Sequence, residues 1–99
     1  MTGRVDELLG ALPAGLMNLY AGGTLLGGSV PSTVGRFFQM ETLVLQKNRL
    51  TGTVPSEIGQ IPTLMNFDLF GNQCDGTLPS ELGLLGAATT LNFASNNFN

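Results

Sequence analysis

Histidine and tryptophan are absent from the 99 residues, and cysteine occurs once. Without histidine the chain has no His-based catalytic triad and no His-containing metal site. A single cysteine forms no internal disulfide, so cysteine usage leaves the redox compartment undetermined. We therefore expect no metal, no cofactor and no enzymatic activity.

Basic residues are also scarce, with four Lys and Arg against seven Asp and Glu, a net charge of −3. Because the four are scattered, no basic patch is available for phosphates, and nucleic acid is not an expected partner. No stretch approaches the roughly 18 to 20 unbroken apolar residues of a membrane helix, so we expect no direct membrane insertion by this segment. A composition of 42% hydrophobic and 11% charged residues nonetheless excludes a disordered chain.

One phrase recurs at intervals of 24 residues. It reads LGGSVPSTVG at 26–35, LTGTVPSEIG at 50–59 and CDGTLPSELG at 74–83. The columns that recur are Gly28, Gly52 and Gly76; Pro31, Pro55 and Pro79; Asn48, Asn72 and Asn96, with Thr24 in the first row; Leu19, Leu43, Phe67 and Leu91; and Leu26, Leu50, Cys74 and Phe98. Since one such unit cannot bury its own apolar face, this period is typical of stacked repeats. Cys74 is then expected to be a buried small hydrophobe rather than a nucleophile.

The period divides the chain into about four units. These are a degenerate first unit at 1–15, units at 16–39, 40–63 and 64–87, and a truncated last unit at 88–99. Solenoids need end caps with polar outer faces. Because Phe93 and Phe98 would lie at an open end, we expect the chain to be a fragment that is marginally stable or self-associates.

Each unit has local signals for a strand and a turn. In TLVLQ, Leu43 and Leu45 point one way and Val44 and Gln46 the other, which is strand periodicity. The asparagine amide has donors and an acceptor for backbone groups turned inward by the bend after the strand, whereas Thr24 offers only a hydroxyl, so a looser first rung is expected.

The rest of the phrase predicts a turn on the far side. The glycines at 28, 52 and 76 suit an unusual φ, and each proline blocks helix continuation. The serines at 32, 56 and 80 are expected to cap one short helical turn, which the glycines at 35, 59 and 83 would end.

The consensus L-x-x-L-x-L-x-x-N-x-L-x-G-x-(V/L)-P-S-x-(L/I/V)-G resembles the leucine-rich repeat in its 24-residue plant-type form, found in receptor-like kinase ectodomains and polygalacturonase-inhibiting proteins. The resemblance implies an α/β solenoid. In that fold a right-handed superhelix carries a short parallel β-sheet on its concave face, with 3₁₀ or turn segments on its convex side.

The variable strand positions of this plan project from the sheet and are the candidates for function. An aromatic residue at an outward strand position, such as Phe70, is the kind of residue that anchors an interface. The candidate ligand-binding residues are Tyr20, Val44, Gln46, Lys47, Asp68, Phe70 and Asn92, and the candidate structural ladder is Asn48, Asn72 and Asn96.

These features predict a non-catalytic binding module for a protein, peptide or glycan ligand. The resemblance implies an extracellular or membrane-associated setting within a longer chain, while a cytoplasmic one stays open. Two alternatives remain, an intracellular scaffold and an enzyme inhibitor of the same repeat type. A signal peptide, cap cysteines, a membrane helix or a kinase domain elsewhere in the gene would distinguish them.

Overall fold

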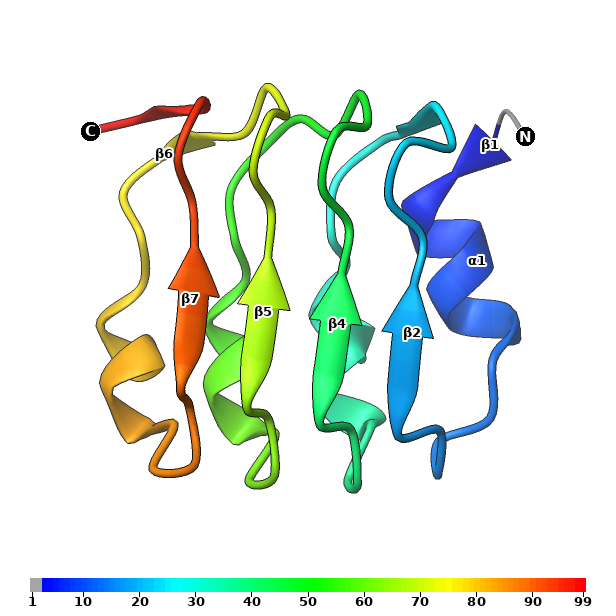
Figure 1. The fold of residues 1–99 in the computed structure, drawn as a ribbon, viewed down its shortest axis with the longest axis vertical. Coiled ribbons are helices and arrows are strands. Elements are labelled where there is room, and N and C mark those ends of the chain that lie inside the picture. Colours follow the sequence, from blue (N-terminus) through cyan, green and yellow to red (C-terminus); the bar gives the residue numbers. More distant parts are fainter. Residues whose placement is uncertain (1–2) are drawn as a thin grey trace.

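A computed structural model describes residues 3–99 (Figure 1). Four rungs follow one another, each with a short strand on one side and a helical turn on the other. The strands are β1 (Gly3–Arg4), β2 (Asn18–Tyr20), β3 (Leu26–Gly27), β4 (Thr42–Val44), β5 (Asn66–Asp68), β6 (Asp75–Gly76), β7 (Thr90–Asn92) and β8 (Asn97–Phe98). The helical segments are α1 (Val5–Ala11) and the 3₁₀ helices η1 (Ser32–Arg36), η2 (Ser56–Gln60) and η3 (Ser80–Leu84).

The main sheet contains four parallel strands in the order β2-β4-β5-β7. Its register places Leu43 opposite Leu19 and Phe67, and Phe67 opposite Leu91. The prediction that Leu43, Phe67 and Leu91 occupy neighbouring parallel strands is therefore confirmed. Backbone pairing continues past the strands, since Lys47 N donates to Phe70 O at 2.7 Å.

A second strip of parallel backbone pairing runs along the solenoid, and the sequence analysis did not anticipate it. β1 pairs with β3, and β6 pairs with β8. Hydrogen bonds link the rungs between them, from Arg49 N to Leu26 O at 2.8 Å and from Gln73 N to Leu50 O at 2.8 Å. Backbone hydrogen bonds thus join successive rungs in two places, in the main sheet and in this second strip.

The glycines at 28, 52 and 76 occupy the same place in this strip in successive rungs, and each carbonyl oxygen accepts a backbone hydrogen bond from the next rung. Their φ values are 78°, 77° and 76°, which is the left-handed region that favours glycine. The expectation of an unusual φ in this column is confirmed.

The predicted roles of serine and glycine in the 3₁₀ turns were wrong. The serines at 32, 56 and 80 are the first residues of η1, η2 and η3, the preceding prolines hold the N-cap position, and no side-chain cap bond forms. The glycines at 35, 59 and 83 lie inside the turns rather than ending them, and their φ is not positive. Space explains the glycine at 59 instead, because a Cβ there would overlap the carbonyl oxygen of Glu81 in the next rung.

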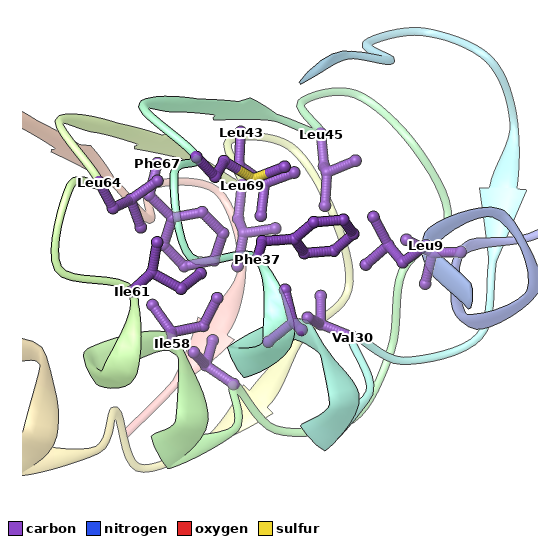
Figure 2. Packing of buried hydrophobic residues seen from close by; sticks show 14 of the residues in the cluster. Leu9, Val30, Phe37, Leu43, Leu45, Ile58, Ile61, Leu64, Phe67 and Leu69 are labelled. Atoms are coloured by element: carbon purple, nitrogen blue, oxygen red, sulfur yellow. The ribbon is translucent and has the colours of Figure 1, made fainter. Parts of the chain in front are cut away.

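The core lies between the main sheet and the 3₁₀ turns. Figure 2 shows its side chains pointing toward one another in this layer. The inward residues of β4 and β5 meet those of the turns, with Phe37, Leu43, Ile58, Ile61 and Phe67 all fully buried. At the C-terminal end, the Phe93 ring packs edge-on against Phe67, with centroids 5.6 Å apart, and against Phe98, at 6.0 Å.

The asparagine column lies between consecutive rungs. Asn72 is buried; its Nδ2 donates to Leu69 O at 2.9 Å and to Leu45 O of the previous rung at 3.0 Å, while its Oδ1 accepts from Leu50 N at 3.0 Å. Asn48 and Asn96 make the corresponding bonds. Thr24 in the first rung donates its hydroxyl to Ala21 O at 2.9 Å.

The N-terminal end of the stack differs from the other rungs. Here α1 replaces the 3₁₀ turn and contributes Val5 and Leu9 to the core. Arg36 of the next rung donates to the carbonyl oxygens of Leu9 and Leu12, at the C-terminal end of α1. Its guanidinium also lies 4.7 Å from the centroid of the Phe37 ring. None of the helices within residues 3–99 has the length and apolar character to span a membrane.

Candidate functional site

The side of the main sheet that faces away from the core is the candidate site, and we call it the open face. Because side chains alternate along a strand, the residues between the buried ones project from this side. The open face comprises Asn18, Tyr20 and Gly22; Thr42, Val44 and Gln46; Asn66, Asp68 and Phe70; and Thr90, Asn92 and Ala94.

The structure brings four of the predicted ligand-binding residues into one row across the sheet. Tyr20 is in register with Val44, Val44 with Asp68, and Asp68 with Asn92. Neighbouring strands are about 4.8 Å apart, so these side chains are immediate neighbours. Tyr20 is 71% exposed, and the other three are half-buried.

Two more predicted residues form the next row. Gln46 and Phe70 follow the ends of β4 and β5, and both are half-buried. A Cβ on Gly22 would lie 2.9 Å from Gln46 Cγ, so the Gln46 side chain covers this glycine of the first rung. Across three successive rungs this row therefore presents a glycine without a side chain, the amide of Gln46 and the aromatic ring of Phe70.

Lys47 lies one residue further on, at the edge of the open face, and is exposed. Its φ is 55°, and the corresponding residues Gly23, Gly71 and Ser95 have φ values of 68°, 73° and 57°. A non-glycine residue in this region is strained by roughly 1–2 kcal/mol. Two of the four rungs avoid the strain with glycine, whereas the second rung keeps a charged side chain there.

Asp68 is half-buried in the middle of the open face. Its Oδ1 accepts a hydrogen bond from Phe70 N at 2.9 Å. The equivalent residue of the next rung, Asn92, accepts the same bond from Ala94 N at 3.1 Å. Asp68 and Asn92 each supply an Oδ1 that accepts this backbone hydrogen bond, so the bond does not require a negative charge.

Sequence reasoning missed Asn18 and Thr42, which share a row of the open face with Asn66 and Thr90. The signal was present, because each lies 24 residues from a residue of the same row. Glu41 directly precedes the first residue of β4. The Asn66 Oδ1 atom is buried and has no hydrogen-bond partner among residues 3–99.

The chemistry of the described residues offers a surface rather than a cavity. Residues 3–99 form no pocket and no group of three or more His, Cys, Asp or Glu side chains. Cys74 is 2% exposed, as its column predicted. Burial, and to a lesser extent the charge of Asp75, raise the pKa of its thiol from 9.0 to about 11, so little thiolate forms at neutral pH.

Stacked rungs with one short parallel strand each, an inward leucine column and an asparagine column define a repeat solenoid. The family model described as Leucine Rich Repeat matches residues 39–61. The chain is a leucine-rich repeat protein, and its repeats are of the plant-receptor type.

Solved structures similar to the chain include ectodomains of plant receptors. The ectodomain of the membrane receptor kinase GASSHO1/SCHENGEN3 from Arabidopsis thaliana, in complex with CASPARIAN STRIP INTEGRITY FACTOR 2, superposes with a TM-score of 0.92 at 33% identity, over 99% of this chain and 12% of that one. The PEPR1–AtPEP1 complex gives 0.89 at 32% identity, over 99% and 14%. The BIR3–SERK2 complex from Arabidopsis thaliana gives 0.80 at 31% identity, over 99% and 51%.

The chain thus spans from about an eighth to about half of the length of these relatives. No curated protein sequence matches it. The similar structures include receptors in complex with peptide hormones, and they indicate no catalytic family.

Proposed function

We propose that the chain is a non-catalytic binding module that recognises a peptide or protein through its open face. In a longer array this face would line the concave side of a right-handed superhelix. The repeat units at 16–39, 40–63 and 64–87, with partial units before and after them, are the rungs of this proposal.

The observation that carries the proposal is a contrast between the two sides of one sheet. The inward row repeats Leu, Leu, Phe and Leu, because each rung must offer its neighbours the same apolar surface. The outward row in the same strands reads Tyr, Val, Asp and Asn. Stacking does not require this variety, so recognition is the better explanation for it.

The complexes formed by similar proteins support a peptide or protein ligand. One is a receptor ectodomain in complex with CASPARIAN STRIP INTEGRITY FACTOR 2, and another is a peptide hormone receptor in complex with RGF2. By this similarity we propose an extracellular or membrane-associated setting within a longer receptor-like or secreted protein. A glycan ligand, an intracellular scaffold and an enzyme inhibitor stay predictions of the sequence alone.

A random peptide library displayed on phage, selected against the purified chain, tests the proposal. Tyr20→Ala and Phe70→Ala are expected to weaken the binding of a selected peptide by about 30-fold each, which corresponds to the roughly 2 kcal/mol of an interface anchor. Phe38→Ala is the matched control, because Phe38 is 55% exposed and lies outside the open face. It is expected to change the Kd less than twofold.

Circular dichroism of the three variants checks that each remains folded. Equal losses of binding in Phe38→Ala and Phe70→Ala, or no loss in either open-face variant, would contradict the proposal.

A further inference from the structure

The charge of Asp68 has no partner among residues 3–99. Arg4 and Asp6 form the one ion pair among residues 3–99, so no described cation pairs with the Asp68 carboxylate. Its Oδ1 is occupied by Phe70 N, and its Oδ2 makes no hydrogen bond to the described residues. A half-buried carboxylate without a cation has lost part of its hydration and has gained no ion pair in return.

The charge is also unnecessary for the fold at this position. Asn92 occupies the same position one rung later and accepts the same backbone hydrogen bond with a neutral amide. An asparagine at 68 would therefore satisfy Phe70 N equally well.

The nearest open-face neighbours of Asp68 carry no charge. The row neighbours of Asp68 are Val44 and Asn92, and Phe70 follows it on the same face, so all three are uncharged. The free acceptor that this part of the open face presents is therefore the Asp68 Oδ2, and it carries negative charge.

We propose that Asp68 is the specificity-determining residue of the open face and that it binds a cationic group of the ligand, a lysine, an arginine or an N-terminal amine. Ammonium and guanidinium groups carry several donors and no acceptor, which matches the Asp68 Oδ2, an acceptor without a donor among the described residues. The aromatic ring of Phe70 on the same face offers a second attraction for such a cation. This inference rests on the proposed function, because it concerns the same face and the same ligand.

The test compares three versions of the chain in the phage selection: wild type, Asp68→Asn and Asp75→Asn. Asp75 is exposed in β6, outside the open face, so Asp75→Asn makes the same change in net charge elsewhere. We expect wild type and Asp75→Asn to select peptides with one position enriched in Lys or Arg. We expect Asp68→Asn to lose that enrichment.

A double-mutant cycle then measures the contact itself. Replacing the enriched Lys of a selected peptide by Gln is expected to raise its Kd for the wild-type chain about tenfold and for Asp68→Asn less than twofold. Additive effects would overturn the inference. So would basic enrichment that survives in Asp68→Asn.

The two proposals fail in different ways. Peptides that need Tyr20 and Phe70 yet bind Asp68→Asn as tightly as wild type would overturn the role of Asp68 alone. Peptides that bind Tyr20→Ala and Phe70→Ala unchanged, or a library from which the chain selects no peptide, would overturn the proposed function and this inference with it.

Discussion

Substitution of Asn72 is the sharpest test of how the rungs are held together. Leu50 N has the Asn72 Oδ1 as its acceptor, at 3.0 Å. Asn72 also donates to the carbonyl oxygens of Leu45 and Leu69. Each of these oxygens has a second asparagine donor, Asn48 for Leu45 and Asn96 for Leu69. Asn72→Ala therefore leaves one buried N–H without its acceptor and leaves two carbonyls with one asparagine donor each.

The magnitude follows from these three groups. An unsatisfied buried N–H costs about 2 kcal/mol, and each weakened carbonyl costs about 0.5–1 kcal/mol. Asn72→Ala is thus expected to lower the free energy of unfolding by about 3–4 kcal/mol, a large fraction of the roughly 5–15 kcal/mol expected for a domain of this size. Asn72→Thr is expected to cost about 2.5–3 kcal/mol, because Thr24 shows that a hydroxyl at this position donates to the carbonyl three residues before it, while Leu50 N still loses its acceptor.

Urea denaturation followed by circular dichroism measures these differences, with the m-value as a check that the unfolded states are comparable. Asn96→Ala serves as the reference, since Asn96 is only half-buried at the last rung and its loss should cost less. An Asn72→Ala variant within about 0.5 kcal/mol of wild type, or an Asn72→Thr variant as unstable as Asn72→Ala, would refute the assignment of the ladder as the link between rungs.

Three further substitutions test separate features. Gly59→Ala should lower the free energy of unfolding by about 1–3 kcal/mol, because the new methyl group would overlap the backbone of Glu81. Gly83→Ala is the control and should change the free energy of unfolding little, because no atom lies within 4 Å of its Cβ position. Urea denaturation compares the two variants. Lys47→Gly should raise the free energy of unfolding by about 0.5–1 kcal/mol, because glycine adopts the positive φ at this position without strain. A lower free energy of unfolding in the same assay would exclude backbone strain at Lys47. Burial raises the pKa of the Cys74 thiol from 9.0 to about 11, so the stability that the neutral thiol contributes is present below pH 9 and is lost as the pH rises to about 11. Cys74→Ala should remove this part of the pH dependence of stability. Thermal melts of both proteins between pH 8 and 11 measure the difference.

The strand positions and the inward columns could be predicted because they follow from residues repeated at one interval. Leu43, Phe67 and Leu91 pair as their spacing indicates. The second strip of backbone pairing could not be predicted in this way. It contains exposed residues such as Asp75 and Asn97, which have no apolar periodicity, and its hydrogen bonds depend on the distance between rungs.

The serine and glycine assignments failed for a related reason. A capping serine and a terminating glycine are local signals, which depend only on residues close by in the chain. At Gly59 the deciding contact is with Glu81 in the next rung, 22 residues away in the chain. In the first rung, the carbonyls at the end of α1 are satisfied by Arg36 of the next rung.

The sequence by itself determined the solenoid and its inward face, since every rung must bury the same columns against its neighbours. It also identified Tyr20, Val44, Asp68 and Asn92 as outward residues, because strand side chains alternate. Only the tertiary structure decided that Asp68 has no cationic partner in the part of the chain that the structure describes, and that Asn92 makes the same backbone contact without a charge. Whether a charge is compensated depends on distances between rungs, and stacking sets those distances after the chain has folded.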